Sequence, residues 1–251
     1  MSITRSTSRR APATERENQG LLLIGHGSER SDGPNRQLLA QVDRLREADI
    51  YGDVQGAVLY GEPTVQSALK ALGERPVHVL PMFMCDGLFT RKIIPAQVAE
   101  TRPDGQGITW GQPVGLSRGL APLIARRIRS RISEENLIEK SVRVLLVGHG
   151  STASDASWQA TERHAARLRK ITGFKSVGTA YLDQPPKFAD VLSNLSGPVC
   201  VVGLFIADGL HAGDDIPAII AGSGKAAEVR YLGAIGSDPA LTDLVVGQLG
   251  I

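Results

Sequence analysis

Short apolar runs alternate along this chain with longer stretches in which apolar residues recur at helical spacing. Runs such as LLLIG (21–25), VLLVG (144–148) and VCVVGLFI (199–206) are apolar at consecutive positions, which is typical of parallel strands buried on both faces. The stretches 35–48 and 157–171 place apolar residues three and four apart, as on one face of a helix. This alternation predicts an α/β fold, with parallel sheets flanked by helices in a doubly wound arrangement.

The predicted elements occur twice in the same order, because the sequence contains an internal duplication. LLLIGHGS (21–28) matches VLLVGHGS (144–151), and PVHVLPMFMCDGLFTRKIIP (76–95) matches PVCVVGLFIADGLHAGDDIP (198–217). Between them, GAVLYGEPTVQSAL (56–69) matches GTAYLDQPPKFADVL (178–192), which sets Pro63 opposite Pro185 and Gly61 opposite Asp183. We therefore predict two similar halves, at 20–134 and 142–251, preceded by a disordered tail at 1–19.

Composition and charge narrow the class of function. The formal net charge of +2 gives no indication of binding to nucleic acid or to a membrane surface, and no apolar run reaches the ~18 residues of a transmembrane helix. The two cysteines, Cys85 and Cys200, are far apart and form no CxxC, which predicts two buried thiols in a reducing compartment. We expect a cytoplasmic monomer that acts on a small molecule.

Three residues able to bind a metal ion follow predicted strands of the C-terminal half. His149 comes directly after the first strand between two glycines, Asp183 closes the second strand, and His211 lies in the turn after a later one. The carboxyl ends of parallel strands meet at one edge of a sheet, where α/β folds bind their ligands. Two imidazoles and a carboxylate suit a divalent first-row metal, and Asp215 is placed to hold the second ring nitrogen of His211.

Two other histidines are predicted to have structural surroundings. His78 lies within a predicted strand and stands opposite Cys200 in the repeat, so we expect it in the core. His164 lies in the middle of a predicted helix among arginines and glutamates, so we expect it to face solvent.

These motifs resemble those of the class II sirohydrochlorin chelatases. The similarity lies in HGS after a first strand, an acid–Pro pair near the end of the second, and GLHxxxDIP after a later strand, and it covers nearly the whole chain from residue 20. It implies ATP-independent insertion of Fe2+ or Co2+ into the tetrapyrrole sirohydrochlorin, with no permanently bound cofactor. The catalytic histidines of the family carry over to His149 and His211, and its metal-site glutamate carries over to Asp183, whose side chain is shorter.

The choice of metal is suggested by what the chain lacks. Some longer family members linked to cobalt carry a His-rich stretch and a CxxC, and neither is present here. The resemblance therefore favours iron, and hence sirohaem, over the alternative of a cobaltochelatase in cobalamin synthesis. Neutral histidine could bind the cation or accept the pyrrole protons, because its ordinary pKa of ~6.5 lies near neutrality.

The N-terminal half departs from the family pattern. It keeps His26, but Phe89 occupies the His211 position and Gly61 the Asp183 position, with Glu62 adjacent. Phenylalanine cannot bind a metal or accept a proton, so we predict a single active site in the C-terminal half. We expect the strand ends of the N-terminal half to form the opposite wall of a cleft, with His26 and Phe89 in contact with the macrocycle.

Sirohydrochlorin carries eight carboxylates, so cationic groups should bind it as well. The basic candidates are Arg91, Lys92, Arg30 and Lys187. Backbone N–H groups near Ser28 and Ser151, expected at helix N-termini, are further candidates.

Two rival functions fit the motifs less well than a chelatase does. A histidine phosphatase would need an arginine before its reactive histidine, where this chain has Gly25 and Gly148. A tetrapyrrole or metal carrier without catalysis would need no intact histidine pair, and an insertion assay separates it from an enzyme.

Overall fold

The computed structural model describes residues 17–29, 32–49, 51–151 and 154–249. The predicted tail at 1–19, apart from its last three residues, and Arg30 lie outside this part of the chain. Within the described residues, no helix has the length and apolar character needed to cross a membrane.

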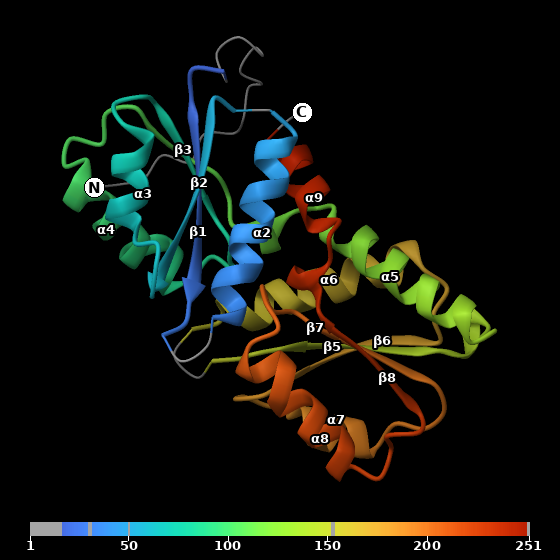
Figure 1. Ribbon diagram of the computed structural model, residues 1–251. Helices are drawn as coiled ribbons and strands as arrows, with labels where there is room; N and C mark the ends of the chain where they lie inside the picture. Colours follow the sequence, from blue (N-terminus) through green and yellow to red (C-terminus); the bar gives the residue numbers. More distant parts are fainter. Residues whose placement is uncertain (1–16, 30–31, 50, 152–153, 250–251) are drawn as a thin grey trace. The chain divides into compact units, whose positions relative to one another are not determined.

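The first compact unit comprises residues 1–117 together with 242–251. Its parallel sheet contains β1 (Gly20–Gly27), β2 (Asp53–Tyr60), β3 (Val77–Pro81) and β4 (Ile108–Trp110), in the order β2-β1-β3-β4. Helix α2 (Gly33–Glu47) covers one face, and α3 (Val65–Leu72) and α4 (Ile94–Thr101) cover the other (Figure 1). Residues 20–25 of β1 are all buried, because helices cover both faces of this central strand.

The second compact unit comprises residues 118–241. Its parallel sheet contains β5 (Arg143–Gly148), β6 (Ser176–Tyr181), β7 (Val199–Gly203) and β8 (Val229–Ala234), in the order β6-β5-β7-β8. Helix α6 (Ala156–Ile171) lies on one face, and α7 (Phe188–Ser193) and α8 (Ile216–Gly222) lie on the other (Figure 1). The matching strand order of the two sheets confirms the predicted fold class of two similar α/β halves.

Each sheet has an apolar layer beneath its pair of short helices. In the first unit, Leu22 and Val79 of the sheet pack with Leu69 of α3 and Val98 of α4. In the second unit, Val147 and Val201 pack with Phe188 of α7 and Ile216 of α8. These layers anchor the short helices to the sheets, and the turns that follow the strands begin from this packed core.

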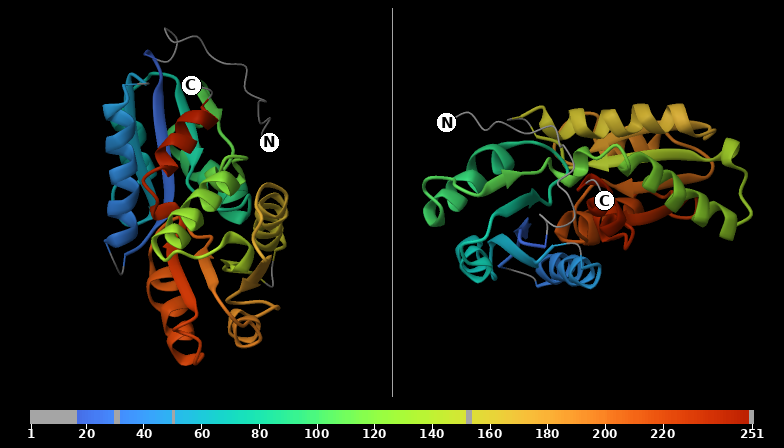
Figure 2. Two further views of the ribbon diagram at one scale, coloured as in Figure 1. Left: turned by 90° about the vertical axis from the view of Figure 1, so that its right-hand side faces the viewer. Right: turned by 90° about the horizontal axis from the view of Figure 1, so that it is seen from above.

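The last helix of each repeat packs in the unit built mainly by the other repeat. Helix α5 (Leu120–Glu134) lies beside α6 in the second unit, where the Arg127 guanidinium donates to the carbonyls of Leu232 and Ala234. Helix α9 (Leu241–Gln248) belongs to the first unit, and its Gln248 side chain donates to the Gln112 carbonyl at 2.6 Å. Figures 1 and 2 show α9, in red, beside the sheet of the first unit.

This exchange divides the chain differently from the sequence repeats. The predicted halves at 20–134 and 142–251 follow the repeats, whereas the compact units separate after residues 117 and 241. The repeat pattern shows the order of elements, but it does not show which sheet an amphipathic helix covers. The domain boundaries at 20–134 and 142–251 therefore remain a prediction from the repeats. In the structure, α5 is grouped with the second unit and α9 with the first.

Three side chains lie in surroundings that differ from those predicted. His164 is buried with 1% exposure and not solvated, because it shares the inner face of α6 with Thr161, Ala165 and Leu168. His78 is half-buried on β3, where its Nδ1 lies 2.9 Å from Thr109 Oγ1. Cys200 is buried as predicted, but Cys85 is only half-buried.

Neither cysteine is a reactive thiolate. Burial raises the pKa of Cys200 to about 11. Burial, and then the negative charge of Asp86, raise the pKa of Cys85. The raised pKa values disfavour a thiolate at either cysteine near neutral pH.

Candidate active site at the strand ends of the second unit

His149 is positioned by a glycine that the chain cannot replace without strain. Gly150 has a φ of +79°, and a Cβ there would lie 2.7 Å from Gln184 Cγ. The backbone therefore turns sharply after β5, and the Gly150 carbonyl comes to 2.9 Å from His149 Nδ1. The imidazole is 44% exposed, so a ligand can reach it.

His211 is held in a π-helical turn after β7. This turn, η4 (Leu210–Asp215), is closed by the Ile216 N–H, which donates to the His211 carbonyl. Single π-helical turns occur often at functional sites, because the wider turn reorients one side chain. Asp215 lies in the same turn, and its Oδ2 is 2.8 Å from His211 Nδ1, which is the contact expected from the sequence.

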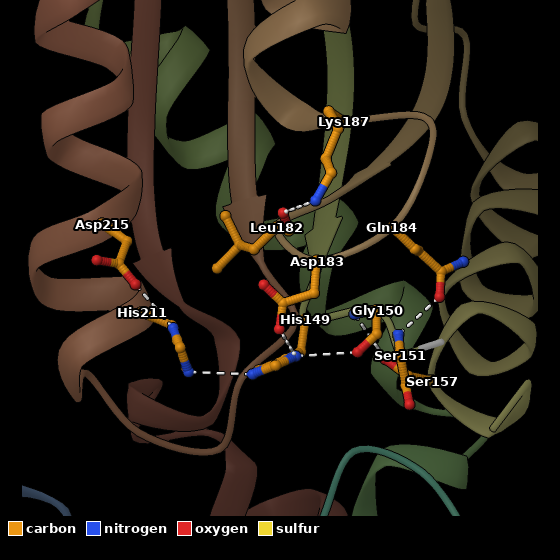
Figure 3. Close-up of polar contacts among 10 residues, drawn as sticks. All are labelled: His149, Gly150, Ser151, Ser157, Leu182, Asp183, Gln184, Lys187, His211 and Asp215. Atoms are coloured by element: carbon orange, nitrogen blue, oxygen red, sulfur yellow. Dashed lines mark hydrogen bonds and ion pairs between the residues drawn. The ribbon is translucent and has the colours of Figure 1, made fainter. Parts of the chain in front are cut away.

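The two histidines face each other through their outer nitrogens. His149 Nε2 lies 3.1 Å from His211 Nε2, and the ring planes cross at 87° (Figure 3). Residues 62 positions apart in the chain thus meet at one edge of the sheet, as the strand-end argument predicted.

Asp183 lies on the far side of His149 from His211. Its Oδ2 is 3.1 Å from His149 Nδ1, and its backbone N–H donates to the His149 carbonyl at 2.9 Å. The order across the site is therefore carboxylate, imidazole, imidazole, carboxylate, as Figure 3 shows. The predicted sharing of one metal by both histidines and Asp183 does not appear in this arrangement, because Asp183 contacts the nitrogen that faces away from the pair.

The neighbours of the inner nitrogens determine where the hydrogens lie. His149 Nδ1 faces a carbonyl and a carboxylate, and His211 Nδ1 faces a carboxylate, all of which only accept hydrogen bonds. Each Nδ1 therefore carries a hydrogen, and each neutral ring points the lone pair of its Nε2 at the other ring. Two lone pairs 3.1 Å apart repel unless a proton or a cation lies between them.

The spacing of the pair fits a metal ion with a cis coordination angle. A cation bound to both Nε2 atoms at about 2.1 Å would subtend an angle of about 95° at their 3.1 Å separation. That angle is close to the right angle between neighbouring ligands of an octahedron. In the described part of the chain, no group of three His, Cys, Asp or Glu is arranged to hold a metal, so the pair would leave most positions open to other ligands.

The donors predicted to bind substrate carboxylates in the second unit already have partners. The Ser151 N–H donates to Gln184 Oε1 at 2.7 Å, and the Lys187 ammonium donates to the Leu182 carbonyl at 2.9 Å (Figure 3). Helix α6 begins only at Ala156, so Ser151 does not lie at its N-terminus. Gln184 fixes this loop, and nothing in the sequence singled it out.

Ser28 in the first unit shows the same arrangement. Its N–H donates to Asn35 Oδ1 at 2.9 Å, and α2 begins five residues later at Gly33. Because α2 begins at Gly33 and α6 at Ala156, neither Ser28 nor Ser151 is the first residue of a helix.

The first unit has aromatic rings at the places that His211 and Asp183 occupy in the second unit. His26 lies 5.0 Å from Phe89 and 4.8 Å from Tyr60, measured between ring centroids. Phe89 occupies the place of His211, as predicted. The place of Asp183, however, belongs to Tyr60 and not to Gly61.

The strand register shows why the sequence pairing was wrong by one residue. Gly25 pairs with Val58 in β1–β2 as Gly148 pairs with Tyr181 in β5–β6. The Val58 N–H then donates to the Pro63 carbonyl, as the Tyr181 N–H donates to the Pro186 carbonyl. Pro63 therefore corresponds to Pro186, the second proline of the PP pair. Matching Pro63 with Pro185 in the sequence displaced the preceding residues of the two repeats by one position relative to each other.

The comparisons with known proteins agree with this architecture. A family model described as CbiX matches residues 20–131 and, a second time, residues 143–250. A protein of Halobacterium salinarum named as a probable sirohydrochlorin cobaltochelatase is 26% identical over 91% of this chain and 89% of its own length.

Solved structures resemble the chain over most of its length. A CbiX described as the terminal enzyme for biosynthesis of siroheme in denitrifying bacteria has a TM-score of 0.79 and 24% identity, over 92% of this chain and 98% of its own. The sirohydrochlorin chelatase SirB from Bacillus subtilis subspecies spizizenii, solved in complex with cobalt, has a TM-score of 0.74 and 19% identity, over 93% and 94%. At these identities the structures establish a common fold.

Proposed function

Because this chain belongs to the CbiX family in both of its repeats, we propose that it is a sirohydrochlorin chelatase that inserts Fe2+ without ATP and yields sirohaem. The observation that carries the proposal is the facing pair of His149 and His211, each with a carboxylate behind it. The names of the relatives support a chelatase that uses sirohydrochlorin, with cobalt in some and sirohaem synthesis in another.

The histidine pair matches the charge balance of the reaction. Insertion places one divalent cation in the macrocycle and releases two pyrrole protons. The two Nε2 lone pairs first bind the hydrated cation and, as it passes to the macrocycle, each is free to accept one proton. The charge balance is the same whichever of the two histidines accepts its proton first.

The two carboxylates act through the histidines that they contact. Asp183 and Asp215 accept hydrogen bonds from the Nδ1 atoms, which keeps both Nε2 lone pairs directed at the cation. Their negative charges also stabilise an imidazolium after it has taken a proton. Asp183 is therefore proposed to position His149 and to add negative charge, in place of the direct ligand role expected from the sequence.

Iron is proposed as the metal on the grounds of what the chain lacks. No His-rich stretch and no CxxC are present in its 251 residues. Two imidazoles bind Fe2+ and Co2+ alike, so cobalt insertion is the alternative. Initial rates with each metal, measured anaerobically on one preparation, decide between them, and a higher kcat/KM with Co2+ would favour the cobaltochelatase.

The insertion reaction itself is tested by the absorption change of sirohydrochlorin when metal enters. We expect His149→Ala and His211→Ala to lower kcat/KM by about 10²–10⁴-fold, the range for removal of an acid–base group. If both variants keep full activity above the spontaneous rate, the site assignment is wrong. If the wild type binds the macrocycle but accelerates insertion of neither metal, the chain is a carrier.

A further inference from the structure

The strand ends of the first unit carry a cluster of exposed rings and one exposed aliphatic side chain. We call His26, Tyr60, Leu88 and Phe89 the aromatic platform. Tyr60 is 44% exposed and Leu88 is 58% exposed, so a ligand can reach both. His26 lies near the end of β1, Tyr60 ends β2, and Phe89 begins the π-helical turn η1 (Phe89–Ile93).

The rings of the platform are held in place by neighbours. His26 Nδ1 is 2.9 Å from the Gly27 carbonyl, which fixes the imidazole. Phe83 stacks against Phe89 at 5.8 Å between centroids, with an angle of 24° between the ring planes. A preformed surface of this kind binds a flat ligand with little loss of side-chain entropy.

The platform also reverses the charge found at the same place in the second unit. In η4 the residues after His211 include Asp214 and Asp215, whereas in η1 the residues after Phe89 include Arg91 and Lys92. The Arg91 side chain is 67% exposed, and its Nε donates to Asp86 at 3.1 Å. Its two terminal nitrogens have no partner among the described residues, so they are free to bind an anion.

We infer that the aromatic platform with Arg91 and Lys92 is a binding site for the flat face and the peripheral carboxylates of a tetrapyrrole, and that it works without a metal ion. The rings supply a surface for stacking, and the two cations neutralise carboxylates. The replacement of a carboxylate by Tyr60 and of an imidazole by Phe89 removes the groups that a cation would need. The identity of the ligand rests on the proposed function.

A consequence is that the platform accepts metal-free and metal-filled macrocycles alike. The second unit presents lone pairs and carboxylates, which respond to the cation, whereas the platform touches only the ring face and the periphery. After the duplication, the first unit would then bind the macrocycle and the second unit would bind the metal ion.

Uroporphyrin, a metal-free porphyrin with eight carboxylates, is the probe for this site, and its fluorescence anisotropy reports binding to the full chain in EDTA. We expect Tyr60→Ala and Phe89→Ala each to weaken binding at least fivefold. Tyr60→Phe, which keeps the ring, should stay within twofold of the wild type. Zinc uroporphyrin should bind within threefold of the metal-free probe.

The cations are tested with a matched control of equal charge. Arg91→Gln and Lys92→Gln should each weaken binding about threefold or more at low salt, and the difference should shrink at high salt because exposed charges are screened. Lys70→Gln, on the exposed face of α3, removes the same charge from a helix on one face of the same sheet and should leave binding unchanged.

The outcomes separate this inference from the proposed function. If the Tyr60→Ala and Phe89→Ala chains bind uroporphyrin like the wild type, or if Tyr60→Phe is as weak as Tyr60→Ala, the platform is not the binding site. Loss of insertion in His211→Ala would still support the chelatase. If the wild type neither binds the porphyrin nor inserts metal into sirohydrochlorin, both proposals fail.

Discussion

Replacing Asp215 by asparagine tests the role of the carboxylates without removing a histidine. The carboxylate accepts the hydrogen of His211 Nδ1 at 2.8 Å, and this bond leaves the Nε2 lone pair facing His149. An asparagine in Asp215→Asn is able to donate to Nδ1 instead. The ring hydrogen then moves to Nε2, where it forms an N–H···N bond to His149 across 3.1 Å and closes the pair to metal.

The expected loss follows from two contributions. Removing one negative charge about 6 Å from the divalent cation, at an effective dielectric constant of about 40 to 80, weakens binding by roughly 1.4–2.8 kcal/mol. This corresponds to a loss of about 10–100-fold. The change of tautomer adds to it, and substitutions behind metal-binding histidines typically cost about 10–100-fold. We therefore expect the KM for the metal to rise about 10–100-fold, while the free energy of unfolding changes by less than about 1 kcal/mol because the pair is half-exposed.

Initial rates of insertion at varied metal concentration measure this effect, with Asp214→Asn as the control. Asp214 is exposed, lies one residue earlier in the same turn and carries the same charge. Long-range nitrogen–hydrogen NMR spectra of the histidines report the tautomer directly. The wild type should show the hydrogen of His211 on Nδ1, and Asp215→Asn should show it on Nε2.

Two results would refute this reasoning. One is a metal KM for Asp215→Asn within threefold of that for Asp214→Asn. The other is a higher metal KM with no change in the His211 tautomer, which would leave the charge alone as the cause.

Two further substitutions test the packing of the units. Arg127→Ala should lower the free energy of unfolding, measured in urea, by about 2–4 kcal/mol, because two carbonyls at the end of β8 lose a charged donor. Replacing the exposed Arg126 by alanine should change this free energy by less than about 0.5 kcal/mol. Equal losses in the two variants would contradict the role of the Arg127 guanidinium. Burial lowers the pKa of His78 from 6.5 to about 4, so the unfolded chain binds a proton more readily than the folded one. This residue should therefore not affect the pH dependence of stability above about pH 7, and should lower stability by at most about 3 kcal/mol as the pH falls from 6.5 to 4. His78→Gln should remove this part of the acid destabilisation in urea unfolding at several pH values, and a variant that loses stability as steeply as the wild type would contradict the prediction.

The α/β fold was predictable because two independent signals agreed on it. Apolar runs such as LLLIG and VLLVG indicated buried strands, and the repeat showed that the same order of elements occurs twice. The exchange of α5 and α9 was not predictable, because an amphipathic helix reveals that it needs an apolar partner but not which sheet supplies it. Arg127 and Gln248 show the partners only once the carbonyls that they contact are placed.

The correspondence of the two halves was predictable only to within one residue. Letter matching cannot tell whether Pro63 corresponds to Pro185 or to Pro186, because both are prolines. The hydrogen bonds of the Pro63 and Pro186 carbonyls decide it, and they bring Tyr60 into the place of Asp183. The aromatic platform therefore became visible only from the strand register.

What the sequence by itself determined is that His149 and His211 meet at one edge of a parallel sheet. Strand order and motif spacing suffice for that, since the carboxyl ends of parallel strands share an edge. The side of each imidazole on which Asp183 and Asp215 lie was decided by the tertiary structure alone. A sharp turn at Gly150 and a π-helical turn after β7 orient the rings, and ring orientation is a matter of three-dimensional backbone geometry that residue spacing does not specify.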